Sequence, residues 1–137
     1  MSARRAHLLS LMELRARSEL GRTGAALGDL RQRELQQFDL MDRLGRMLEL
    51  SAQHGAEPMS PGALASAHYL GHTLSRELSA TQERMRRTRE EREALEHELA
   101  RQHQRARVLG DHAGTARLAI RREAEEAEEA AMIRRPA

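Results

Sequence analysis

The feature that most constrains this chain is a heptad repeat of small and apolar residues in its second half. From Leu64 to Ala130, positions spaced by alternating steps of three and four form one stripe, and fourteen of its twenty members are Ala, Leu, Ile or Met. A stripe of period 3.5 sustained over ten repeats is typical of a coiled-coil seam. The first half carries a looser stripe, whose members are Leu9, Ala16, Leu20, Leu27, Leu30, Met41, Leu44 and Leu48, with Glu13, Thr23, Glu34 and Gln37 interrupting it.

The prolines divide the chain into two helices. Pro58 and Pro61 lie in the middle and Pro136 is the penultimate residue, which leaves two long proline-free segments. Proline disrupts a helix interior but is tolerated in a first turn, so Ser60 and Pro61 predict an N-cap and helix start. Gly55 predicts a helix end with a left-handed glycine cap. We therefore expect one all-α domain over 1–137: a helix at about 3–54, a turn at about 55–60 and a helix at about 61–134, forming an antiparallel coiled-coil hairpin.

The two stripes also predict a register. Pairing them antiparallel about residues 57 and 58 places Met41 opposite Leu74 and Leu30 opposite Met85, with steps of three and four matching at every layer. In this register residues beyond about Gly114 have no partner, so the second helix overhangs the first by about 35 Å at 1.5 Å per residue.

Composition excludes several classes of protein. Only two residues are aromatic and there is no cysteine, so neither a ring-rich globular core nor a disulfide or thiolate metal site is available. No apolar run is long enough to span a membrane, and charges at residues 13–19 interrupt any signal-peptide core. Twenty-three basic residues, all arginine, are balanced by twenty-one acidic ones. We expect a cytoplasmic protein with no direct membrane insertion.

No residue pattern predicts catalysis, a metal or a cofactor. His68 and His72 have the i,i+4 spacing of helical metal ligands, but no third ligand is placed near them. The arginine-rich stretch 84–92 is interleaved with glutamates and has no aromatic platform, so we expect a solvated helix face and no nucleic-acid binding. Glycine clusters at 21–28 and 110–114 predict either flexible joints or sites where helices approach closely. The chain is expected to bind other proteins and to be no enzyme.

The whole chain resembles the FliJ family, the coiled-coil stalk of the flagellar type III protein export apparatus. The resemblance lies in the turn Pro58-Met59-Ser60-Pro61-Gly62, in the unequal helices, and in the closing string from Glu128 to Pro136, which is acidic, then Ala-Met, then basic, then proline. It implies a stalk like the γ subunit of rotary ATPases, without enzymatic activity or cofactors. The implied partners are a hexameric export ATPase, an export-gate membrane protein and export chaperones, at the cytoplasmic face of the inner membrane. By analogy with γ, the end carrying both termini would enter the ATPase pore.

The resemblance also implies site residues. The family's partner-binding patch resembles Gln37, Met41, Leu44, Leu48, Leu74, Leu78, Thr81 and Met85 here, although leucines stand where the family has tyrosines. The same eight residues fall on the predicted seam, so packing between the helices is an equal interpretation. In the C-terminal tail, the implied contacts are Met132, Arg134 and Arg135. Two alternatives stay open: the equivalent stalk of a virulence-type injectisome, and a generic cytosolic coiled-coil adaptor or scaffold.

Overall fold

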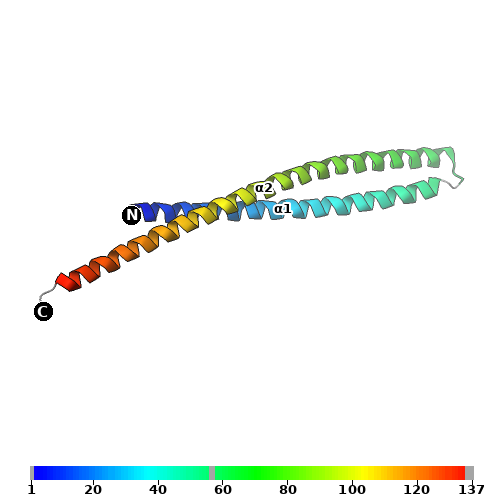
Figure 1. The fold of residues 1–137 in the computed structure, drawn as a ribbon. Coiled ribbons are helices and arrows are strands. Elements are labelled where there is room, and N and C mark those ends of the chain that lie inside the picture. The colour runs from blue at the N-terminus through cyan, green and yellow to red at the C-terminus, as the bar shows by residue number, and fades with distance from the viewer. Residues whose placement is uncertain (1, 56–57, 135–137) are drawn as a thin grey trace. The chain divides into compact units, whose positions relative to one another are not determined.

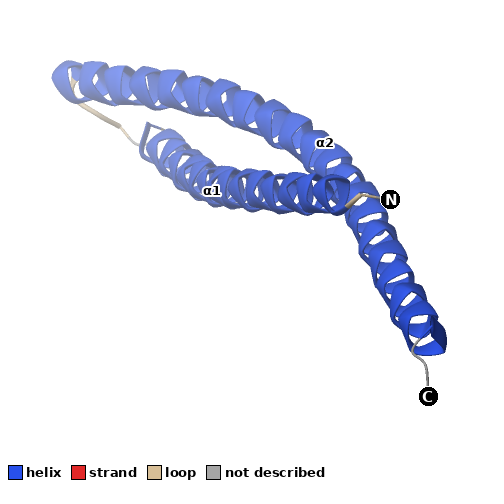
Figure 2. Ribbon diagram, turned by 90° about the vertical axis from the view of Figure 1, so that its left-hand side faces the viewer, coloured by secondary structure: helices blue, strands red, loops and turns tan. Residues whose placement is uncertain are grey.

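The computed structural model describes residues 2–55 and 58–134, and it contains two helices, α1 (Ala3–Gly55) and α2 (Pro61–Arg134). They run antiparallel and pack against each other as a coiled-coil hairpin (Figure 1). In the described part of the chain all regular structure is helical (Figure 2). The predicted fold class is confirmed, and the helix boundaries agree with the prediction to within one residue.

Serine side chains cap the first turn of each helix. The Ser60 Oγ accepts a hydrogen bond from the Ala63 N–H at 3.2 Å, and the Ser2 Oγ accepts one from the Arg5 N–H at 3.3 Å. These bonds satisfy N–H groups that have no partner within the helix, so the predicted N-cap at Ser60 is confirmed. The predicted left-handed cap at Gly55 is wrong: Gly55 is still part of α1, and no glycine in the described residues has a positive φ. Glycine adopts right-handed helical angles as well as left-handed ones, so the helix continues through it.

The heptad stripes are the protected faces of both helices. In α2 every stripe position from Ala67 to Ile120 is buried or half-buried, whereas Leu64 and the positions after Ile120 are exposed. In α1 the protected positions keep the alternation of three and four at 6, 9, 13, 16, 20, 23, 27, 30, 34, 37, 41, 44, 48 and 51. The four polar residues that interrupt the predicted α1 stripe therefore lie on the seam itself.

The contacts between the helices group into two units with different cores. Unit 1 comprises Met1–Ala25 and His97–Ala137, and unit 2 comprises Ala26–Glu96. The buried apolar residues of unit 1 are all alanine: Ala6, Ala16, Ala106, Ala113 and Ala116. Unit 2 buries leucines and two threonines: Leu27, Leu30, Leu44, Leu74, Thr81 and Thr88. Small side chains let helix axes approach closely, so unit 1 buries little apolar surface per layer and depends on close packing.

The predicted register is wrong by about one heptad. That register places Ser51 opposite Leu64 and Glu13 opposite Gln102. In unit 2 a Cβ placed on Gly71 would lie 3.9 Å from the Ser51 Oγ, and in unit 1 a Cβ placed on Gly110 would lie 3.1 Å from the Glu13 Oε1. Each α1 position therefore meets α2 seven or eight residues further along than predicted. A shift of one heptad keeps stripe against stripe, which is why periodicity alone does not distinguish the two registers.

The shift also changes where pairing begins and ends. Residues 61–66, the start of α2, are all exposed, because α1 lies opposite later residues. At the other end, in unit 1, α2 continues past the N-terminus of α1, and residues 121–134 are all exposed (Figure 1). The overhang is confirmed, but it begins several residues later than predicted and spans about 21 Å at 1.5 Å per residue.

Most of the interior glycines are not sites of close helix approach. A Cβ added at Gly21, Gly24, Gly28 or Gly114 would meet no atom within 4 Å. Gly110 is the exception, and its neighbour is the flexible end of the Glu13 side chain. Close approach therefore does not explain the cluster 21–28, and the flexible-joint hypothesis remains for it.

The alanine core of unit 1 gives the first prediction. Ala113 is fully buried, so Ala113→Leu should overpack the seam and lower the free energy of unfolding by about 1–3 kcal/mol. Ala127 is exposed beyond the end of α1, so Ala127→Leu should change it by less than about 0.5 kcal/mol. Urea unfolding followed by circular dichroism measures both. Equal effects of the two substitutions would contradict the assignment of Ala113 to the seam.

Candidate partner-binding surfaces

The eight residues of the predicted partner patch all lie on the seam of unit 2. They are buried or half-buried between α1 and α2, with Thr81 only 1% exposed and Leu74 only 6% exposed. The list is Gln37, Met41, Leu44 and Leu48 on α1, and Leu74, Leu78, Thr81 and Met85 on α2. They pack the hairpin, as the alternative interpretation expected. Their role in binding a partner stays a prediction, and a partner would reach mainly the half-buried members at the edge of the seam.

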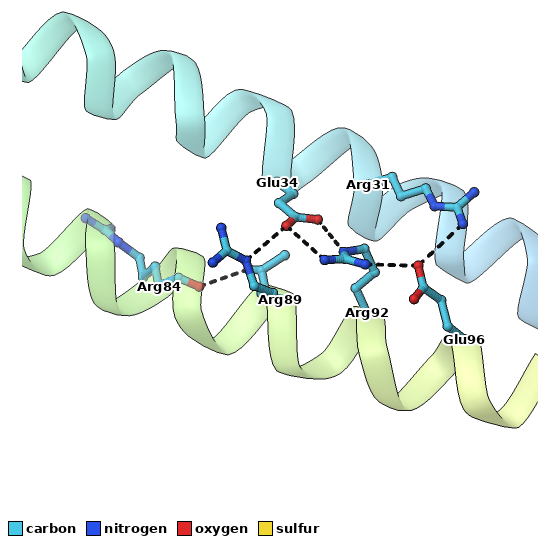
Figure 3. A network of polar contacts seen from close by, with 7 residues as sticks. Arg31, Glu34, Arg84, Arg89, Arg92 and Glu96 are labelled. Carbon is cyan, nitrogen blue, oxygen red and sulfur yellow. Dashed lines mark hydrogen bonds and ion pairs between the residues drawn. The ribbon is translucent and has the colours of Figure 1, made fainter.

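A network of charged side chains crosses the seam of unit 2 (Figure 3). Arg92 donates from its Nε to the Glu34 Oε2 at 2.6 Å and from its Nη1 to the Glu96 Oε1 at 3.0 Å. Arg89 lies 3.5 Å from the second oxygen of Glu34, and Arg31 of α1 lies 3.5 Å from Glu96 of α2. Glu34 and Arg92 are mostly covered, with side chains 17% and 23% exposed. Charges this well covered need their partners, so the network ties α1 to α2 at one place along the stripe.

The pKa values in this network shift in the directions that favour the ion pairs. Hydrogen bonds to Glu34 and then Glu96 raise the pKa of Arg92. The hydrogen bond from Arg92, and then that from Arg31, lower the pKa of Glu96. Both shifts favour the charged forms of Arg92 and Glu96, so these two side chains remain charged at neutral pH.

Two large apolar side chains are exposed beside this network. Leu35 and Phe38 of α1 are 65% and 60% exposed, and Phe38 is the only phenylalanine of the chain. With Met85 of α2 they line a shallow groove that also includes Arg31, Glu34 and Arg92. Exposed aromatic and apolar residues next to paired arginines are typical of protein-binding surfaces. Leu35 and Phe38 lie off the heptad stripe, so the periodicity of the sequence does not predict this groove.

The histidine pair lies in a second groove of unit 2. His68 and His72 are exposed and line this groove with Leu48, Ala52 and Gly71. Among the described residues no three His, Cys, Asp or Glu side chains are grouped so that they could hold a metal ion. The pair therefore contributes to the surface of the hairpin near the start of α2.

The arginine-rich stretch is occupied by ion pairs on the outside of α2. Arg86 bonds to Glu83 at 2.7 Å and also to Glu90, and Arg87 bonds to Glu83 at 3.3 Å. The hydrogen bond from Arg86 is the largest cause that lowers the pKa of Glu83 to about 2. These arginines face carboxylates of their own helix, which agrees with the expected solvated face.

The C-terminal segment of α2 presents large side chains with no cover. Met132 and Ile133 are 74% and 85% exposed, and Arg134 is exposed at the last position of the helix. Arg135, the third predicted tail residue, lies outside the described residues. Neither α1 nor α2, as far as they are described, contains a stretch that is long and apolar enough to cross a membrane.

Comparisons of the chain with family models, with curated proteins and with solved structures found no match. The resemblance to FliJ proteins therefore depends on the residues of this chain alone.

The charge network gives the second prediction. Arg92→Leu should lower the thermal midpoint, because it leaves the covered carboxylate of Glu34 with only Arg89 nearby. Replacing both partners, as Glu34→Leu/Arg92→Leu, should recover most of that loss, because no covered charge then remains unpaired. Arg86→Leu removes an exposed pair and serves as the matched control with a small effect. A double variant less stable than Arg92→Leu would contradict this account.

The pKa shifts give the third prediction. Carboxylates with lowered pKa values stabilise the fold above their usual pKa, near 4.5 for Glu83, and lose that contribution as the pH falls toward the folded value of about 2. The thermal midpoint, measured by circular dichroism, should therefore be steady from pH 7 to about 5 and fall between about pH 4.5 and 2. Glu83→Gln should make this fall smaller, whereas Glu49→Gln, which removes an exposed glutamate outside these ion pairs, should not.

Proposed function

We propose that this chain is a non-enzymatic stalk that couples components of a flagellar type III protein export apparatus. Its partners would be the hexameric export ATPase, the export-gate membrane protein and export chaperones. It would act in the cytoplasm, peripherally at the inner membrane. The observation that carries the proposal is a hairpin of unequal helices whose longer helix ends in an exposed segment with the acidic, Ala-Met, basic string of FliJ proteins.

The amount of exposed surface supports a role in binding proteins. The chain exposes 10763 Å² for a mass of 15.5 kDa. A compact monomer of this mass would expose about 7,200 Å² by the usual scaling. The excess is carried by two helices that each present most of their circumference to solvent. A coupling stalk uses such a surface, because it must contact several partners along its length.

The exposed end of α2 supports the proposed contact with the ATPase. Met132 and Ile133 offer large apolar side chains that are 74% and 85% exposed. Inserted into the pore of a six-fold ring, a single helix end would contact the subunits unequally and bias their assembly or turnover. No bond-making chemistry is required of the stalk.

The injectisome stalk and the generic adaptor remain the alternative functions. The injectisome stalk differs only in its partners. An adaptor would act by self-association, so sedimentation separates it: a stalk should remain a monomer over a wide concentration range, whereas a dimerising adaptor should not.

The fourth prediction tests the stalk function directly. The purified chain should increase hexamer formation and ATP hydrolysis by the export ATPase of the same organism, measured by light scattering and phosphate release. Ile133→Asp should weaken binding to the ATPase by about tenfold or more, as expected for a buried apolar anchor. Tyr69→Asp, at a comparably exposed position in the first part of α2, should leave binding unchanged. The proposal fails if the unmodified chain neither binds the ATPase nor changes its assembly or hydrolysis.

A further inference from the structure

The heptad stripes of this hairpin are compatible with more than one register. Both stripes keep an unbroken alternation of three and four, from residue 6 to 51 in α1 and from 67 to 120 in α2. A slide of seven residues, about 10 Å at 1.5 Å per residue, therefore brings the α1 stripe opposite the α2 stripe again. Apolar periodicity gives no large preference between the observed register and the neighbouring one.

The threonine hydroxyl contacts of the unit 2 seam do not depend on the register. The Thr88 hydroxyl donates to the carbonyl of Arg84 at 3.0 Å, and the Thr81 hydroxyl accepts from Arg84 at 3.4 Å, all within α2. Among the residues described, the polar contacts that cross between the helices of unit 2 all belong to the network of Arg31, Glu34, Arg89, Arg92 and Glu96. A slide of one heptad would separate Glu34 from Arg92.

The observed register also leaves groups unsatisfied. The Oε1 atoms of Gln37 and Gln102 are buried and have no hydrogen-bond partner. Leu64 belongs to the α2 stripe but is 54% exposed, because α1 does not reach it. The neighbouring register would cover Leu64 with Ser51. It would also place Leu30 opposite Met85, whereas in the observed register Leu30 lies near Arg92. The uncovered Leu64 reduces the advantage of the observed register.

We propose that the Glu34–Arg92 network is a register latch, and that the hairpin has a second register one heptad away which becomes populated when the latch opens. In the second register α2 moves along α1 so that the start of α2 becomes paired and its C-terminal overhang lengthens by seven residues. A bound partner that takes Arg92 or Glu34 into its own ion pairs would open the latch. Sliding of packed elements by a discrete step is an established way of carrying a signal between distant sites. The latch does not depend on which partner the chain binds.

Engineered cysteine pairs report the register directly, because the chain has no cysteine of its own. Met41 lines a surface groove together with Leu78 and Gln82, so Met41→Cys/Thr81→Cys reports the observed register. Met41→Cys/Leu74→Cys reports the proposed second register. Met41→Cys/Thr88→Cys reports a slide in the opposite direction, which would uncover more of the start of α2. A disulfide requires Cα atoms within about 7 Å, so each pair forms only near its own register.

The test compares disulfide formation with and without the latch. The three double-cysteine variants are called here the Thr81, Leu74 and Thr88 pairs, after the α2 residue that is replaced. With Glu34 and Arg92 unchanged, the Thr81 pair should give the highest yield of disulfide. Adding Glu34→Ala/Arg92→Ala should raise the yield of the Leu74 pair by about tenfold, as a shift of population between two states would, and should leave the Thr88 pair at background. The matched control Glu83→Ala/Arg86→Ala removes an exposed ion pair of α2 and should leave all three yields unchanged.

Two outcomes would overturn the proposal. One is a Leu74 pair that stays at background in the latch variant. The other is a Leu74 pair that rises together with the Thr88 pair, which indicates unfolding and not a slide. Circular dichroism of the chain locked through the Leu74 pair provides an independent measurement. Its helicity should match that of the chain locked through the Thr81 pair, and a marked loss of helix would show that no second register exists.

Discussion

The ion pair between Glu34 and Arg92 is the interaction on which the arrangement of this hairpin depends. A heptad seam brings two helices together, but it repeats every seven residues and does not say which heptad meets which. Glu34 and Arg92 occupy seam positions where each is too well covered to remain unpaired, and each lies within bonding distance of the other in the observed register. The pair therefore favours this alignment over its heptad neighbours, in which stripe also faces stripe.

The two units differ in the side chains and polar contacts of their seams. Unit 2 holds the charge network, the larger buried side chains and the exposed Leu35 and Phe38 next to the seam. Unit 1 packs alanines, and a polar contact from Arg117 to the Ser10 Oγ at 3.3 Å joins its two helices. An alanine seam holds helices close but specifies little about their alignment. The charge network therefore specifies the register of unit 2.

The proposed stalk function and the proposed latch both depend on communication between separate places along the two helices. A stalk contacts partners at separate places along two helices, and any coupling between those places needs an element with two discrete arrangements. A heptad slide is such an element, and the charge network provides the contact that biases it. The exposed groove at Phe38 adjoins that network, so a partner bound there would be well placed to influence Glu34 and Arg92.

The sequence by itself determined the helices, their boundaries, the stripe that each buries and the existence of an overhang. Heptad spacing, helix-forming composition and proline positions are local properties, and they need no knowledge of the partner helix. Only the tertiary structure decided the register. The register in turn sets where the overhang begins and pairs Glu34 with Arg92. Seen as an isolated residue, Glu34 interrupts a stripe, and nothing in the α1 sequence identifies Arg92 as its partner. The opposite charges on the two stripes were the available signal, but pairing them is a contact between residues 58 positions apart in the chain. Apolar periodicity, being the same in every heptad, carries no information on that contact.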